Sequence, residues 1–134
     1  MKEPIELARQ FLKLAEDDIK SFKLLASSSE IANSQVGFHA QQALEKCLKA
    51  VLVLNKIEFR KTHDLNELLE LLHQHKISMP PNSDLLDEFN PYAVSLRYDL
   101  FYDEISLDRE LAAQIIANVF SWASKLILKD KAGK

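Results

Sequence analysis

The segment from Phe38 to Leu54 constrains the fold more than any other, because its apolar and polar residues recur with the period of an α-helix. One broad face, projected at about 100° per residue, gathers apolar and small residues: Ala40, Ala43, Leu44, Cys47, Leu48, Ala50 and Val51. The opposite side gathers polar residues: His39, Gln42, Glu45, Lys46 and Lys49. Small side chains on the apolar face would let a second helix approach closely. The pattern predicts the central helix of a small all-helical domain.

Four further segments show apolar residues at spacings of three and four, so we expect them to be helical as well. Their ranges are 1–29, 62–76, 83–96 and 106–128, and the central helix should run from 31–34 to about 54. The segment 83–96 should break at Pro91 and restart, because proline removes a helix hydrogen bond. The sequence therefore predicts a single all-α domain over residues 1–134.

Short polar side chains mark two of the expected helix starts. Asp64 followed by Glu67 is a capping-box-like start with Asp64 in the cap position. Ser106 is the expected cap of the last helix. The apolar face of that helix should carry Leu107, Leu111, Ile115, Val119 or Phe120, Trp122 and Leu126. Because few residues separate the first two helices, they should form an antiparallel hairpin.

The composition limits the classes of function. A chain of 134 residues with 47% hydrophobic residues can bury a core without disulfides or metals. Cys47 is the only cysteine, which excludes an internal disulfide and a multi-cysteine zinc site. No signal peptide is evident, and no apolar run approaches the roughly 20 residues that span a bilayer, so we expect a cytoplasmic protein. The net charge of −3 argues against a general nucleic-acid-binding protein but is compatible with a local basic groove.

Several residue types that often carry chemistry have a structural interpretation here. His73 and His75 lie two apart, whereas helical metal ligands usually lie four apart, so no metal site is expected. Cys47 falls on the apolar face, where a cysteine is more often a small core residue than a nucleophile. Gly37 and Gly133 are the only glycines, which excludes a glycine-rich phosphate loop.

His39, Lys46 and Lys49 lie on a polar strip of the central helix, which is a candidate basic groove. Glu45 and Lys49 have the spacing of a helix-stabilising ion pair, so the strip either binds an anion or is a solvated helix face. His63 stands beside the cap residue Asp64, and it is either functional or half-buried next to that cap.

Arg97-Tyr98 is the most suggestive local group. An arginine can bind phosphate through two parallel hydrogen bonds, and a tyrosine can stack on a base. The structural alternative is that Arg97 holds helix carbonyl oxygens or pairs with Asp99, Asp103 or Glu104.

Four motifs in a fixed order resemble the HEPN domain family of small helical proteins. They are Leu14-Ala15-Glu16-Asp17-Asp18, the segment from Phe38 to Ala50, His63-Asp64-Leu65, and Arg97-Tyr98 before the last helix. The pattern Gln-Gln-Ala-x-Glu-Lys-x-x-Lys-Ala, which begins at Gln41, is the most specific of them. The order and intervals extend over most of the chain, from Ile5 to Leu128.

The resemblance implies an up-and-down bundle of four or five helices that forms a homodimer. It also implies a role beside a small partner nucleotidyltransferase, as a toxin–antitoxin pair or a related two-gene system, with nucleotide or RNA binding as the usual function. Many active members are metal-independent ribonucleases, whose motif is an arginine followed by a histidine after four to six intervening residues. After Arg97, the corresponding positions hold Tyr102, Asp103 and Glu104. Because the ordinary pKa of tyrosine is near 10, it does not replace imidazole at neutral pH, and the resemblance indicates the non-nucleolytic branch.

We therefore predict a binding module for a nucleotide or a short single-stranded RNA. Arg97 would meet phosphate and Tyr98 would stack on a base, and Lys46, Lys49 and His63 would contribute if the fold brings them to the same groove. No catalytic residue, cofactor, metal or membrane contact is expected. Two alternatives stay open. One is a ribonuclease that uses Arg97 with another acid, such as His63 or His39, and the other is a pure protein-interaction module that holds the nucleotidyltransferase.

Overall fold

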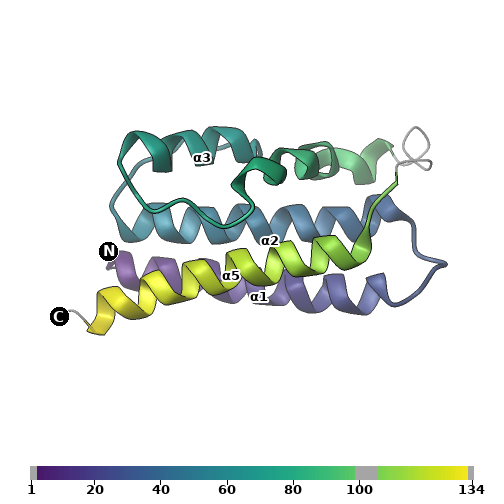
Figure 1. Ribbon diagram of the computed structural model, residues 1–134, viewed down its shortest axis with the longest axis horizontal. Coiled ribbons are helices and arrows are strands. Elements are labelled where there is room, and N and C mark those ends of the chain that lie inside the picture. Colours follow the sequence, from purple (N-terminus) through teal and green to yellow (C-terminus); the bar gives the residue numbers. More distant parts are fainter. Residues whose placement is uncertain (1–2, 99–105, 133–134) are drawn as a thin grey trace.

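The computed structural model describes residues 3–98 and 106–132, and no β-strand occurs among them. Five helices follow one another: α1 (Pro4–Ala26), α2 (Asn33–Leu54), α3 (Leu65–Gln74), the 3₁₀-helix η1 (Ser83–Tyr98) and α5 (Arg109–Ala132). α1 and α2 form the expected antiparallel hairpin, α5 packs against both, and α3 and η1 lie along another side of α2 (Figure 1). The predicted all-α helical bundle is confirmed.

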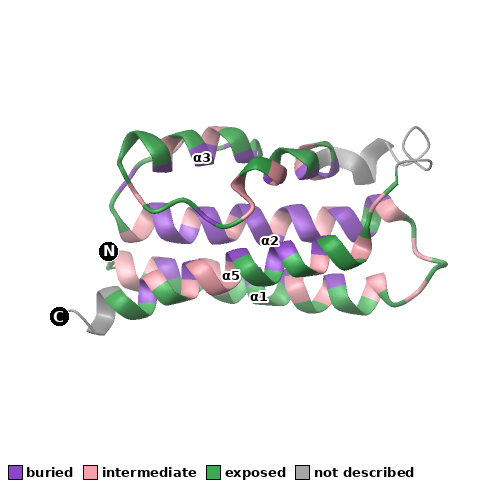
Figure 2. Ribbon diagram, in the orientation of Figure 1, coloured by how far each residue is buried: buried purple, intermediate pink, exposed green. Residues whose placement is uncertain are grey.

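α2 lies at the centre of the bundle, because all four other helices pack against it. The residues predicted for its apolar face are all buried, as the purple segments of α2 in Figure 2 illustrate: Ala40, Ala43, Leu44, Cys47, Leu48, Ala50 and Val51. Burial raises the pKa of the Cys47 thiol to about 12, so the thiolate needed for a nucleophile does not form at neutral pH. Cys47 is a core residue, as predicted.

The start of α3 partly follows the sequence pattern. Oδ1 of Asp64 accepts a hydrogen bond from the backbone N–H of Asn66 at 2.9 Å, so the predicted cap is confirmed. Glu67 does not complete a capping box, because its carboxylate accepts two hydrogen bonds from Arg60, at 2.7 and 2.8 Å. Asn90 of η1 accepts from the backbone N–H of Leu65 at 2.9 Å and ties η1 to this cap.

The predicted break at Pro91 is wrong, since η1 continues through it to Tyr98. Proline fixes φ near −65°, which lies within the 3₁₀ range, so the ring fits this tighter helix. Gly37 sets the contact between η1 and α2. A Cβ atom at Gly37 would lie only 2.4 Å from Cδ1 of the Tyr92 ring, so the close packing of Tyr92 on α2 requires a glycine.

α5 begins at Arg109, and its cap lies two residues beyond the predicted cap. Asp108, not Ser106, caps it, because Oδ1 of Asp108 accepts from the backbone N–H of Leu111 at 3.0 Å. The predicted apolar face is confirmed except at one position. Ile115 and Val119 are buried, and Leu107, Phe120, Trp122 and Leu126 are partly buried against the core, whereas Leu111 is 42% exposed. The buried residues of α5 are Ala112, Ile115, Ile116, Val119, Ala123 and Ile127.

Length and composition alone would let the window Arg109–Lys129 of α5 cross a bilayer, with a mean hydropathy of 1.4. The prediction considered only uninterrupted apolar runs, and α5 meets the criterion by its overall length and composition, although polar residues interrupt it. Its outward positions Glu110, Gln114, Asn118 and Lys125 are polar and exposed, while its inner face packs on α1 and α2. This is the two-sided pattern of a bundle helix.

Arg109 joins the start of α5 to the turn between α1 and α2. Its guanidinium donates hydrogen bonds to the carbonyl oxygens of Ala26 and Ser28, at 3.1 and 2.8 Å. It also donates to the carbonyl oxygen of Ile31 at 2.6 Å and to Oδ1 of Asn33 at 3.0 Å. Carbonyl groups at a helix end have no hydrogen-bond partner within the helix. The Arg109 side chain therefore supplies donors to carbonyl oxygens of the α1–α2 connection.

We predict that Arg109→Ala lowers the free energy of unfolding by about 2–4 kcal/mol, because it removes charge-assisted hydrogen bonds and leaves part-buried carbonyl groups unpaired. Urea unfolding followed by circular dichroism measures the change. Arg60→Ala is the matched control, since Arg60 is exposed and pairs with Glu67 on the surface, and it should have little effect. Equal effects of the two substitutions would contradict the role of Arg109.

Candidate functional site

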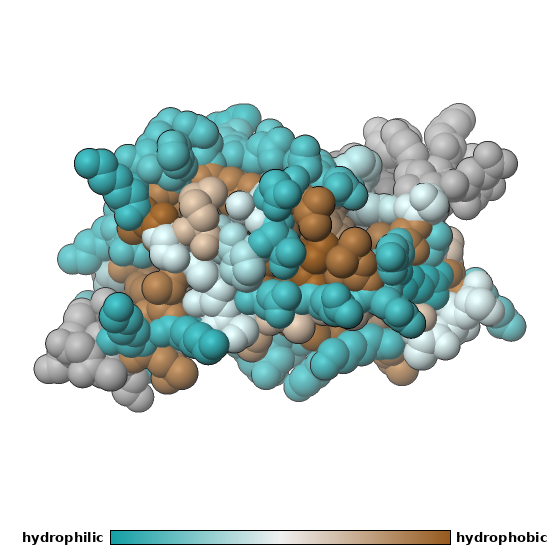
Figure 3. Space-filling model, viewed as in Figure 1, coloured by the Kyte–Doolittle hydropathy of each residue, from teal (hydrophilic) through white to brown (hydrophobic). Residues whose placement is uncertain are grey.

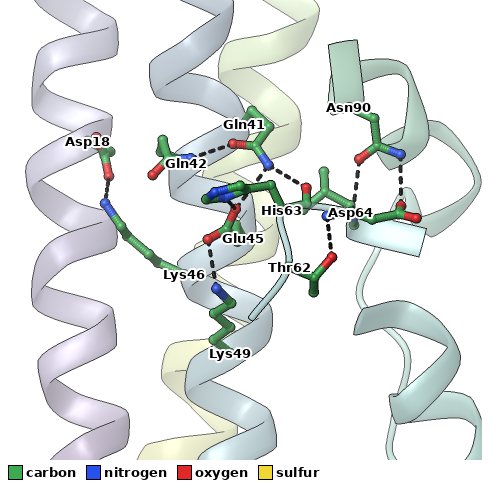
Figure 4. Close-up of polar contacts among 11 residues, drawn as sticks. Asp18, Gln41, Gln42, Glu45, Lys46, Lys49, Thr62, His63, Asp64 and Asn90 are labelled. Atoms are coloured by element: carbon green, nitrogen blue, oxygen red, sulfur yellow. Dashed lines mark hydrogen bonds and ion pairs between the residues drawn. The ribbon is translucent and has the colours of Figure 1, made fainter. Parts of the chain in front are cut away.

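A row of polar side chains runs along α2 where α1 and α3 flank it (Figure 4). We call this row the α2 polar strip and define it as His39, Gln41, Gln42, Glu45, Lys46 and Lys49. It includes two of the residues predicted from the sequence, Lys46 and Lys49. Two buried carboxylates organise the strip: Asp18 of α1 and Glu45 of α2 itself.

Asp18 links α1 to the first half of the strip. Its Oδ1 atom lies 3.0 Å from Nδ1 of His39, and its Oδ2 atom accepts from Nζ of Lys46 at 2.5 Å. A carboxylate can only accept hydrogen bonds, so Nδ1 of His39 carries the proton in this contact. Each oxygen of Asp18 therefore holds one side chain of α2 in place.

Glu45 links α2 to the start of α3. Its Oε1 atom lies 2.9 Å from Nδ1 of His63 and accepts from Nε2 of Gln41 at 3.2 Å. Its Oε2 atom accepts from Nζ of Lys49 at 2.9 Å. Gln41 also donates to the backbone carbonyl of His63 at 2.9 Å, which fixes the backbone just before α3.

The environment keeps Glu45 ionised although only 4% of the residue is exposed. Burial by itself raises the pKa of a carboxyl group, but the hydrogen bonds from Lys49, His63 and Gln41 outweigh burial and hold the pKa of Glu45 below its ordinary value. A buried charge with this many partners satisfies the requirement that ions inside a protein be paired.

The two carboxylates repeat one arrangement. Each bridges a lysine and the Nδ1 atom of a histidine: Asp18 joins Lys46 to His39, and Glu45 joins Lys49 to His63. Among residues 3–98 and 106–132, no hydrogen bond engages the second ring nitrogen, Nε2, of either histidine. The strip therefore presents two oriented imidazole rings, and the side chains of His39 and His63 are 27% and 52% exposed.

The structure brings together some of the predicted site residues but not all of them. Lys49 and His63 meet on Glu45, whereas Lys46 is held separately on Asp18. The lysines are partly buried and paired, so the strip is not a solvated helix face, and the side chain of His63 is 52% exposed. Arg97 and Tyr98 end η1, but their side chains lie outside the described residues.

Sequence reasoning gave no individual role to Asp18 or Gln41, which complete the two networks. The available signal was the pair Gln41 and Glu45, which have the spacing of neighbours on one helix face. Gln41 and Glu45 lie between the predicted apolar face and the lysines, and this position indicated that their side of α2 packs against another element. Nothing local distinguished buried Asp18 from exposed Asp17.

Aromatic rings flank the strip near its two ends. The ring of Phe38 packs edge-on against His39, with 5.4 Å between the centroids. Nζ of Lys49 lies 5.5 Å from the centroid of Phe59. Both phenylalanines are half-buried. Within the part of the chain that the structure describes, no three His, Cys, Asp or Glu side chains form a group that could hold a metal ion.

Comparison with known proteins identifies the class to which this bundle and its polar strip belong. The family model described as "HEPN domain" matches residues 8–126, so the chain belongs to the HEPN domain family. Over 57 residues it is 42% identical to the Methanocaldococcus jannaschii protein named "Putative toxin MJ1304". That match covers 42% of this chain and only 36% of the length of the relative. No solved structure matches.

We predict that Glu45→Gln lowers the free energy of unfolding by about 3 kcal/mol at pH 7, because it leaves Lys49 buried without its anion. The folded-state pKa of Glu45 is lowered, so its stabilisation is present above the ordinary value of 4.5 and is lost as the pH falls through the folded-state pKa. The difference between the wild type and Glu45→Gln should therefore shrink below pH 4.5.

Chemical unfolding at a series of pH values measures this difference. Asp17→Asn is the matched control, because Asp17 pairs with Lys13 at the same four-residue spacing on an exposed surface. A difference for Glu45→Gln that stays constant from pH 7 to pH 3 would show that its ionisation does not stabilise the fold.

Proposed function

We propose that this HEPN domain binds a nucleotide or a short single-stranded RNA through the α2 polar strip. It acts in the cytoplasm as a homodimer, beside a small partner nucleotidyltransferase in a toxin–antitoxin-like pair. One observation carries the binding proposal: His39 and His63 are both oriented by buried carboxylates, with Nε2 available and a lysine beside each.

The hydrogen-bonding groups of the strip suit a phosphate-ester ligand better than they suit a protein partner. Each lysine ammonium has three donors, and one of them is used in the contact with its carboxylate. The remaining lysine donors can bond phosphate oxygens, and Nε2 of each imidazole, whose proton is on Nδ1, can accept a hydrogen bond from a hydroxyl or amino group of the ligand. Phe38 and Phe59 offer ring surface near the strip, and base–aromatic stacking contributes about 1–3 kcal/mol per base.

The charge balance defines the mode of binding. The charges of Asp18 and Glu45 cancel those of Lys46 and Lys49. Recognition therefore rests on directed hydrogen bonds and stacking more than on net charge, which fits a short ligand better than a long phosphate backbone. Arg97 and Tyr98 stay in the proposal as the phosphate-binding and base-stacking residues of η1.

We predict that His63→Gln weakens nucleotide or RNA binding about tenfold or more, equivalent to about 1.4 kcal/mol. Glutamine can keep a hydrogen bond to Glu45 but has no second ring nitrogen. Calorimetric titration with AMP, ATP and a short oligouridine measures the affinity. His73→Gln is the matched control, because His73 is exposed at the end of α3, away from the strip. No binding at millimolar ligand, or equal affinity in the two variants, would refute the proposal.

The partnership has separate support and a separate test. The relative from Methanocaldococcus jannaschii carries the name of a toxin, which supports the proposal that this chain belongs to a toxin–antitoxin-like pair. A small nucleotidyltransferase encoded next to this chain, co-purifying with it, is the expected result. Co-purification without any ligand affinity would instead favour the pure interaction module. Light scattering measures whether the chain alone is a dimer.

A ribonuclease is the second candidate, and the carboxylate–histidine pairs favour it. A carboxylate on Nδ1 fixes the tautomer and orientation that an imidazole needs to act as a general acid or base through Nε2. Incubation of the protein with structured and unstructured RNA in chelator separates the two functions. For a binding module we predict intact RNA. Cleavage that both Arg97→Ala and His63→Gln abolish would establish the ribonuclease.

A further inference from the structure

A second surface feature lies between η1 and the start of α5, away from the strip. Side chains of both elements surround a hollow of about 250 Å³. Its lining residues are Leu85, Glu88, Phe89, Tyr92, Ser106, Leu107, Asp108, Leu111, Ala112 and Ile115. Figure 3 shows a hydrophobic area on the face that η1 and α5 share. The volume is below the roughly 300–1,000 Å³ of pockets for drug-sized ligands, so it suits one or two anchoring side chains.

The period of the 3₁₀-helix explains how η1 contributes to this hollow. Side chains three residues apart in a 3₁₀-helix lie directly above one another. Phe89 and Tyr92 therefore share the buried face and form the aromatic floor, with 6.5 Å between their ring centroids. Leu85 and Glu88 share the next face and form one lip. Leu111, a large apolar side chain that is 42% exposed, belongs to the opposite lip.

Both lips carry a carboxylate. Glu88 comes from η1 and Asp108 from the residue before α5, and both are exposed. Oδ1 of Asp108 accepts the capping hydrogen bond from Leu111, which fixes the side chain at the lip. Within the described ranges, 3–98 and 106–132, neither carboxylate forms an ion pair with a lysine or arginine.

The nearest cation in the sequence does not neutralise this site. Arg109 follows Asp108 directly, but its guanidinium is directed to the turn between α1 and α2, where it donates four hydrogen bonds. The hollow is thus apolar and aromatic at its floor and negative at two opposite lips. This combination favours a side chain with an apolar stem and a cationic end, because the rings contribute a cation–π attraction and the lips contribute ion pairs.

We infer that the hollow is a docking site for a partner protein, and that the partner inserts an arginine or lysine flanked by apolar residues. The cationic end lies between Glu88 and Asp108, the stem contacts Phe89 and Tyr92, and a flanking apolar residue covers Leu111. This surface is built by η1 and α5 and shares no residue with the α2 polar strip. The two proposed surfaces can therefore be tested with separate substitutions.

The test uses the full chain labelled with nitrogen-15 and a capped heptapeptide with one arginine between two leucines. We predict that peptide at about millimolar concentration shifts amide resonances within 85–92 and 106–115. Glu88→Gln and Asp108→Asn should each raise the Kd about threefold or more, and the double variant about tenfold. Asparagine caps helices as well as aspartate does, so Asp108→Asn should leave α5 intact.

Two matched controls separate the effect of the carboxylates at the lips from the effect of the surrounding negative charge. Asp87→Asn and Glu110→Gln remove nearby exposed carboxylates that do not line the hollow, and they should leave the Kd within about twofold of the wild type. A peptide with glutamate in place of arginine should not bind. His63→Gln should leave peptide binding unchanged, which separates this test from the test of the nucleotide site.

Several outcomes would overturn the inference. They are the absence of shifts at millimolar peptide, shifts confined to other helices, and equal binding by the glutamate peptide. An affinity that Glu88→Gln and Asp108→Asn do not alter would also refute it. If sedimentation shows that these two variants lose self-association, the occupant is a second copy of this chain and not a separate basic partner.

Discussion

The need to pair two carboxylates inside the bundle determines how its polar side is built. Glu45 is buried on the central helix, and an unpaired charge there would cost several kcal/mol. Three side chains pair with Glu45: Lys49 and Gln41, each one turn away on α2, and His63 from the chain before α3. Asp18 does the same between α1 and α2. The flanking helices are thus held against α2 by polar contacts as well as by the apolar core.

The same pairing decides what the strip can offer to a ligand. Lysines that would form a basic row on an isolated helix are committed to Asp18 and Glu45, so their positive charge is largely cancelled. The imidazole rings are fixed but keep Nε2 available, and the half-exposed His63 is the most accessible of these groups. Structural and functional interpretations of the strip are therefore compatible: the ion pairs that stabilise the fold also orient the side chains that we propose for ligand binding.

The sequence predicted what depends on local pattern, and it missed what depends on distant partners. Helical periodicity identified the apolar face of α2, and the chemistry of Asp64 identified the cap of α3. The start of α5 was misplaced because Ser106 and Asp108 are both good capping residues, and only the backbone geometry selects between them. The pairs formed by Asp18 with Lys46 and by Glu45 with His63 join residues 28 and 18 positions apart, and no local rule specifies them.

The 3₁₀ conformation of η1 gives this short element three separate roles. With three residues per turn, every third side chain keeps to one face, whereas the faces of an α-helix would drift along the chain. One face, with Leu86, Phe89 and Tyr92, is buried against the core. The face with Asn90 bonds the cap of α3 at Asp64, immediately after His63. The face with Glu88 borders the hollow beside α5. The 3₁₀-helix η1, in which Pro91 restricts the backbone, therefore contributes one face to the cap that follows His63 and another face to the hollow beside α5.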